Sequence, residues 1–221
     1  MTAKKMPTRR SRALRRTGAA LLLLALTVLL NGWRLGPQLA LRESEDLWGT
    51  GKTAIIGTFG HLPIGSRRGT VYLTANENVA VLSELRISLL SGWSVEAGCV
   101  LDCSDEKSRV HTALWTLYDG EESFGYFFGR VDDSEIREVS FLYGHQNTDG
   151  KLTILPINGD PPVSKRADWM KWEGHDYFVL PYRYDAKYTN EHPGWFYPCI
   201  DGELVSPEMR VDSWTGTSLG N

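Results

Sequence analysis

The chain has 221 residues, of which 42% are hydrophobic and 11% aromatic, enough for one packed domain with attachments, so global disorder is excluded. Its formal net charge of −3 hides an asymmetry, because seven of the 24 basic residues, and no acidic residue, lie within residues 1–16. The remainder holds 17 basic against 27 acidic residues. Such an acidic body repels nucleic-acid phosphates, so we expect no binding of DNA or RNA.

The apolar run TGAALLLLALTVLLNGW (17–33) directly follows the basic arm and contains no charged residue. A basic segment followed by an apolar one is the pattern of an export signal. The run reaches the lower limit of roughly 17 residues for a spanning helix, and residues 31–40 do not place small residues as a cleavage site requires. We therefore predict a basic cytoplasmic arm over residues 1–17 and an uncleaved transmembrane signal-anchor helix over residues 18–33.

The positive charges on the short N-terminal side predict that this side is cytoplasmic. The expected localisation is the cell membrane, as a single-pass protein with an extracytoplasmic C-terminal domain, and secretion after signal cleavage is the alternative. Residues 34–47, RLGPQLALRESEDL, are expected to be a linker, and residues 48–221 the extracytoplasmic domain. The membrane, contacted through residues 18–33, is the first predicted partner.

The pentapeptide GTGKT (49–53) resembles the phosphate-binding loop of nucleotide-binding enzymes. That loop reads G-x-x-x-x-G-K-S/T, with a strand before it and a helix after it, but the chain has Asp46 where the first glycine should stand. The residues that follow, AIIGTFGHLPIG (54–65), contain three glycines and a proline and do not predict a helix. We interpret GTGKT as a glycine-rich approach to the first strand and expect no nucleotide.

From Trp48 onward, short segments rich in Val, Ile, Tyr, Phe and Trp alternate with clusters of Gly, Asn and Asp, as in a β-protein. The predicted strands are 53–59, 69–75, 79–90, 93–102, 111–119, 123–131, 137–144, 151–157, 175–184, 194–200 and 203–205. The Asp-Gly pairs at 149–150 and 201–202 are hairpin signals. Residues 79–90 also fit a helical stripe, although we favour a strand, and SKRADWMKW (164–172) fits a short helix.

Three cysteines, an odd number, lie in a compartment expected to be oxidising: Cys99, Cys103 and Cys199. In a strand, Cys99 and Cys103 would lie on one face about 13 Å apart, too far for a disulfide. A bridge from Cys99 or Cys103 to Cys199 would close a loop of roughly 100 residues. The alternative is three buried, unpaired thiols.

The sequence contains no pattern of metal ligands. No two of its five histidines lie within ten residues of each other, whereas zinc sites use closely spaced His or Cys pairs. We expect neither a metal nor a cofactor.

Acidic residues concentrate in YDGEE (118–122) and VDDSEIRE (131–138). A glycosidase needs two opposed carboxylates, but these residues flank predicted strand ends, where Asp and Ser commonly supply turns. We favour solvated turns, and an extracytoplasmic hydrolase, possibly glycan-acting, that uses acids of residues 118–138 is the alternative function.

Tryptophans are the main candidates for contact with a ligand. Those in strongly apolar strands are expected in the core: Trp93, Trp115 and Trp195. Those near polar segments could form a surface platform for a sugar or a protein partner: Trp169, Trp172 and Trp214.

Five segments carry a resemblance to known proteins: LLSGWSV (89–95), HTALWTLY (111–118), FFGRVDDSEIREV (127–139), HDYFVLPY (175–182) and FYPCIDGELV (196–205). Their order resembles that in small exported or membrane-anchored β-domain proteins of Gram-positive bacteria, which are uncharacterised as a group. The central feature is an aromatic–G–x–V/I–x–D/N–x–x–I–x–x–V unit. The resemblance implies a compact, mostly antiparallel β-domain on the outer face of the membrane and assigns no catalytic residue.

The sequence thus predicts a mostly β protein, in which an N-terminal transmembrane helix precedes an antiparallel β-sandwich or barrel-like domain. No catalytic signature emerges. The favoured function is a non-enzymatic binding or interaction module at the cell envelope, whose partner is another envelope protein or a glycan.

Overall fold

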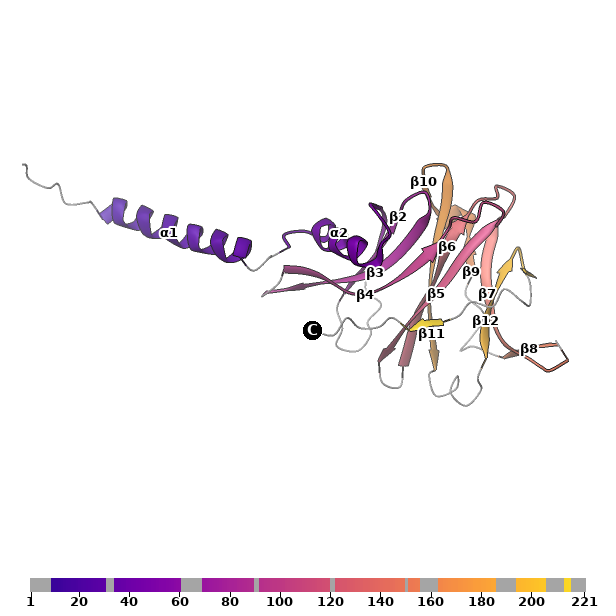
Figure 1. Cartoon of the computed structure of the whole chain (residues 1–221). Helices are drawn as coiled ribbons and strands as arrows, with labels where there is room; N and C mark the ends of the chain where they lie inside the picture. The colour runs from indigo at the N-terminus through magenta and orange to yellow at the C-terminus, as the bar shows by residue number, and fades with distance from the viewer. Residues whose placement is uncertain are drawn as a thin grey trace, which may run out of the picture.

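The computed structural model describes residues 9–30, 34–60, 69–89, 92–119, 122–149, 151–155, 163–185, 194–205 and 213–215. Two helices come first, α1 (Arg9–Leu30) and α2 (Pro37–Trp48), and the later elements are strands apart from one turn of 3₁₀ helix, η1 (Arg166–Asp168). The strands form three sheets, which we name proximal, middle and distal by their distance from α1 (Figure 1). The expected mostly β, antiparallel architecture is confirmed.

In spatial order, the proximal sheet contains β1 (Ala54–Phe59), β2 (Thr70–Ala75), β3 (Val79–Ser88) and β4 (Gly92–Asp102). The middle sheet contains β10 (Met170–Trp172), β11 (His175–Asp185), β6 (Glu122–Val131), β5 (Val110–Asp119) and β14 (Ser213–Thr215). The distal sheet contains β13 (Glu203–Leu204), β12 (Trp195–Ile200), β7 (Glu138–Gln146) and β8 (Leu152–Leu155), with β9 (Val163–Lys165) paired to β7. Among the described strands, only β14 pairs in parallel, with β5.

The middle sheet is buried on both faces. Successive residues of β6 enter different cores: Tyr126 and Phe128 pack with the proximal sheet, whereas Phe127 packs with the distal sheet. On β5, Trp115 likewise packs with the proximal sheet and Leu114 with the distal sheet. The sequence of a strand that is buried on both faces is a continuous apolar run and not an alternation of apolar and polar residues. The molecule is therefore a sandwich with three layers of sheet and two cores.

Helix α2 forms a fourth layer on the outer face of the proximal sheet. Its Ala40 and Leu41 are buried against Tyr72 and Leu85. One face of the helix within residues 34–47, which we expected to be a linker, therefore packs against the domain. The sequence of α2 contains too few apolar residues to predict that one of its faces is buried.

The GTGKT segment joins α2 to β1. Gly49, with φ of +67°, ends α2 in the left-handed conformation that favours glycine, and β1 begins five residues later at Ala54. A helix thus precedes the segment and a strand follows it, the reverse of the order in a phosphate-binding loop. The interpretation as a glycine-rich approach to the first strand is confirmed.

Residues 79–90 and 164–172 are the two segments beyond Trp48 whose sequences fit a helix. Residues 79–88 of the ambiguous segment form β3, so the strand interpretation is confirmed there. The short helix predicted over residues 164–172 is wrong except for η1, because β9 and β10 on either side of it pair with β7 and β11. Pairing with distant strands outweighs the local helical pattern.

No helix among the described residues combines the length and the apolar character that crossing a membrane requires. The transmembrane helix predicted over residues 18–33 is thus not shown by the structure, and residues 31–33 lie outside its described part. Helix α1 begins within the basic arm and includes five arginines.

Candidate functional site

The predicted tryptophan platform does not form. Trp169 is 7% exposed and packs in the core between the middle and distal sheets, where its indole N–H donates to Ser164 Oγ at 2.9 Å. Trp172 packs instead on the core between the proximal and middle sheets. The backbone of Trp214 lies in β14, and its side chain is outside the described part of the structure. Trp169 and Trp172 therefore pack in two different cores and do not form a common surface platform.

The predicted disulfide is also corrected, because all three cysteines are free and buried. Cys99 and Cys103 lie in the core between the proximal and middle sheets, whereas Cys199 lies on β12 of the distal sheet, with the middle sheet between them. Burial raises the pKa of Cys99 and Cys103 to about 12, and burial also raises the pKa of Cys199. Thiols with such pKa values are poor nucleophiles at neutral pH.

The two acidic clusters lie at opposite ends of β6. Tyr118 and Asp119 end β5 and Glu122 begins β6, whereas residues 132–138 follow the other end of β6. A strand of ten residues spans about 30 Å, but the carboxyl groups of a glycosidase lie about 5–10 Å apart. The two clusters therefore cannot supply opposed catalytic carboxylates to one site.

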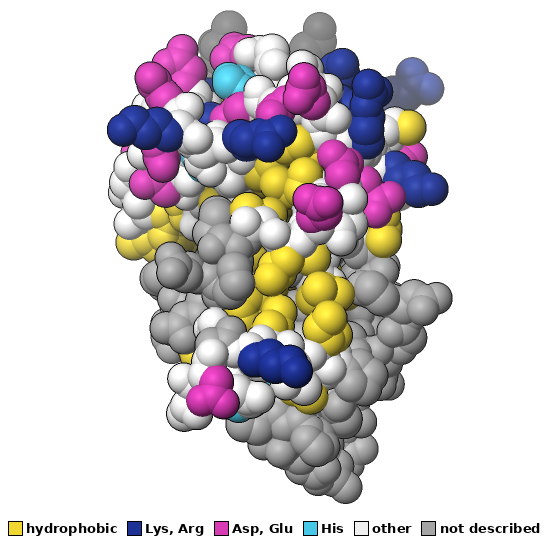
Figure 2. All heavy atoms as spheres, turned by 90° about the vertical axis from the view of Figure 1, so that its right-hand side faces the viewer, with side chains coloured by type: hydrophobic (Ala, Val, Ile, Leu, Met, Phe, Trp, Pro, Cys, Tyr) yellow, Lys and Arg dark blue, Asp and Glu magenta, His cyan; other side chains and the backbone are white. Residues whose placement is uncertain are grey.

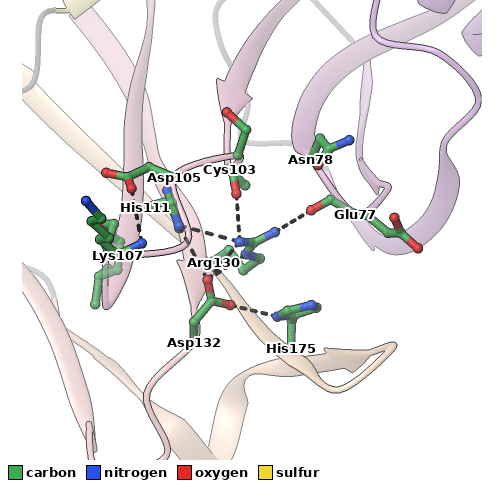
Figure 3. Close-up of polar contacts among 12 residues, drawn as sticks. Glu77, Asn78, Cys103, Asp105, Lys107, His111, Arg130, Asp132 and His175 are labelled. Carbon is green, nitrogen blue, oxygen red and sulfur yellow. Dashed lines mark hydrogen bonds and ion pairs between the residues drawn. The ribbon is translucent and has the colours of Figure 1, made fainter.

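A buried polar network joins the proximal and middle sheets around Arg130 (Figure 3). Arg130, the next-to-last residue of β6, is 4% exposed and donates to the carbonyl oxygens of Glu77 and Cys103, both at 2.7 Å. Its Nε and Nη2 both donate to Asp132 Oδ2, at 3.0 and 2.8 Å. The guanidinium thereby ties the end of β6 to the β2–β3 turn and to the residue after β4.

Two histidines flank the carboxylate of Asp132 in this network. Nδ1 of His175, at the start of β11, donates to Asp132 Oδ1 at 2.7 Å. Nε2 of His111, at the start of β5, lies 3.4 Å from Asp132 Oδ2 and 3.5 Å from Nη2 of Arg130. Burial, followed by the charge of Arg130, lowers the pKa of His111 below its usual value, so the buried ring is neutral at pH 7.

We interpret this network as a structural clamp rather than as a reactive centre. Its guanidinium and carboxylate are engaged with each other and with neighbouring protein groups, as buried charges require. Within the described part of the chain, no three His, Cys, Asp or Glu side chains are grouped so that they could hold a metal ion. No motif in the sequence marks Arg130, and the available signal is a single basic residue within the apolar run of β6.

The distal sheet has an apolar outer face. Phe196 of β12 and Phe141 and Tyr143 of β7 point into the core, so their alternate neighbours point outward. The outward apolar positions that keep some exposure, which we call the distal face, are Leu142, Ile154, Val163, Trp195 and Leu204, whereas Tyr197 and Cys199 on the same side of β12 are buried. In Figure 2, apolar side chains form a stripe on this side of the molecule.

The distal face departs from the usual pattern of an outer sheet, which alternates apolar residues inside with polar residues outside. Ile154 is 58% exposed, Val163 is exposed, and Trp195 is 39% exposed. Trp195 was expected in the core. That expectation is wrong, because its side chain lies on the outer face of the distal sheet. Trp115 is fully buried, as expected. Contiguous apolar patches on an outer surface are a mark of interaction sites.

No protein-family model, curated protein or solved structure matches this chain. The distal face is therefore the feature on which a functional interpretation rests.

Proposed function

We propose that this protein is a non-catalytic interaction module at the cell envelope, which its N-terminal segment tethers to the membrane and whose distal face binds another envelope protein. The observation that carries the proposal is the row of outward apolar side chains on the sheet farthest from α1 (Figure 1). A tether at one end of the stack leaves the sheet at the other end accessible to a partner.

The chemistry of the N-terminal segment supports the tether. The leucines of α1 whose side chains the structure describes are exposed, including Leu21, Leu22 and Leu24. They follow a basic arm of the kind that remains on the cytoplasmic side. The resemblance to small exported proteins of Gram-positive bacteria supports the same placement.

The composition of the distal face favours a protein over a glycan as the partner. Ile154, Val163 and Leu142 are aliphatic, and aliphatic side chains pack against protein cores but offer a sugar neither stacking nor hydrogen bonds. Trp195 adds an aromatic side chain of the type that dominates the binding energy of protein interfaces.

Photo-crosslinking tests this proposal on the full chain in membranes of a Gram-positive host. A benzophenone amino acid would replace Ile154 or Val163 on the distal face, with Leu47, an exposed leucine of α2, as the matched control position. We expect one protein adduct of the same mass from both distal positions and none from position 47. Adducts of equal yield from all three positions, or none from the distal ones, would refute the proposal.

Two further measurements sharpen the test. With the crosslinker at position 154, the added substitution Val163→Asp should lower the adduct yield roughly tenfold, because a charge on the apolar face must be desolvated on binding. Digestion of the adduct then identifies the class of partner. Loss of the mass shift on muramidase treatment would show a glycan and contradict the protein assignment, whereas loss on protease treatment would support it.

A further inference from the structure

The chain leaving α1 is fixed to the hairpin that joins β3 to β4. The backbone N–H of Trp93 donates to the carbonyl oxygen of Arg34 at 3.0 Å, and Arg34 forms an isolated parallel bridge with Gly92. Gly92 has a φ of +70°, and a Cβ atom there would overlap the carbonyl oxygen of Arg34. The hairpin is therefore held only four residues beyond the last residue of α1, Leu30.

Four large aliphatic side chains are exposed around this junction, and we call them the basal surface: Leu35, Leu39, Ile87 and Leu89. Leu89, at the tip of the hairpin, is 93% exposed. Three of the four, together with Trp93, line or border a hollow of about 260 Å³. In Figure 1 the hairpin reaches out from the proximal sheet toward α1, so the basal surface faces the side from which α1 enters.

We propose that the basal surface lies in the lipid–water interface of the membrane to which α1 tethers the protein. This inference rests on the proposed tether and adds a second point of contact to it. A surface four residues from the end of a membrane-bound helix cannot move far from the bilayer, since that length of chain spans at most about 14 Å. The bilayer is therefore the partner that this surface meets first.

The residues around the basal surface fit the interface between lipid and water. Arg34, which forms an ion pair with Glu43, and Trp93 line the same hollow as the exposed aliphatic side chains. Arginine and tryptophan are typical of interfacial segments, where an apolar body enters the acyl boundary and a polar end stays among the headgroups. A second contact also fixes the orientation of the domain, so that the distal face points away from the membrane.

Fluorescence quenching in vesicles tests the proposal with the full-length chain. The variant Leu89→Cys would carry an environment-sensitive fluorophore, and Ile154→Cys, an exposed aliphatic position on the distal face, would serve as the matched control. The native cysteines are all buried and should take up no label, which the unsubstituted chain checks. Ile87→Cys provides a second basal position.

The vesicles would contain phosphatidylglycerol and phosphatidylcholine with a quencher attached to the lipid headgroup region. For chains that float with the vesicles, we expect at least about twofold quenching at positions 89 and 87 and little at position 154. Equal quenching at all positions, or none at 87 and 89, would overturn the basal contact while leaving the tether intact. Failure of the chain to float with vesicles would overturn the tether and, with it, this inference.

Discussion

Arg130 connects three parts of the fold through one side chain. Its guanidinium donates to the carbonyl oxygens of Glu77 and Cys103 and to the carboxylate of Asp132. Because the side chain is buried, these partners replace the water that a charged group otherwise needs. Removing one partner of such a pair leaves the other charge buried without compensation, which costs more than the pair contributes when intact.

Arg130→Met should therefore lower the free energy of unfolding by about 3–5 kcal/mol. Arg109→Met is the matched control, because Arg109 pairs with Asp133 at the surface, and its effect should be much smaller. Urea unfolding followed by circular dichroism measures both. Equal effects of the two substitutions would show that Arg130 does not clamp the sheets.

His111 should make the stability of the protein depend on pH. Burial lowers its pKa in the folded state below 6.5, whereas the unfolded chain takes up the proton near that value. Stability should therefore fall as the pH drops below about 6.5, by at most about 1.4 kcal/mol per pH unit. His111→Gln should weaken this dependence, as urea unfolding at pH 7.5 and pH 5.5 would measure. An unchanged difference between the two pH values would rule out His111 as its source.

At the scale of the element, α2 is part of the domain although its sequence reads as a linker. Leu41 is 4% exposed against the proximal sheet, whereas Leu47 on the same helix is exposed. The carboxylate of Glu45 also accepts hydrogen bonds from the backbone N–H and the hydroxyl of Thr53, at 2.8 and 2.6 Å. These contacts hold the end of α2 against the start of β1.

Leu41→Ala should lower the free energy of unfolding by about 2–5 kcal/mol, because it leaves a cavity between α2 and the proximal sheet. Leu47→Ala should change it by less than about 0.5 kcal/mol. Chemical unfolding of the two variants, which remove the same atoms from one helix, provides the comparison. Similar small effects would mean that α2 detaches from the sheet at little cost.

At the scale of the molecule, the two cores share the middle sheet. Strand β6 supplies Phe128 to the core facing the proximal sheet and Phe127 to the core facing the distal sheet. A loss of packing on one side of this sheet therefore weakens the support of the other side. The three sheets should unfold together rather than one after another.

Leu73→Ala, in the core facing the proximal sheet, and Phe141→Ala, in the core facing the distal sheet, test this coupling. Each should lower the stability by about 2–5 kcal/mol and shift one common unfolding transition. Near- and far-ultraviolet circular dichroism should give the same midpoint for each variant. Two separate transitions, each sensitive to one substitution, would show independent layers.

The sequence by itself determined most strands, the hairpin turn at Asp201-Gly202 and the role of GTGKT. These features depend on local physics: the alternation of apolar residues, the turn preference of Asp-Gly, and the left-handed conformation that Gly49 adopts. The apolar run of β6 could likewise be read directly, because a doubly buried strand needs apolar side chains at successive positions.

Only the tertiary structure decided which strands share a sheet and what each face meets. Trp169 and Trp172 lie three apart in sequence yet enter different cores, and Cys199 is separated from Cys99 by a whole sheet. The exposure of Trp195 is equally invisible in its strand, since the four residues that follow it in β12 are all buried. Such outcomes depend on contacts between residues far apart in the chain, which no local pattern encodes.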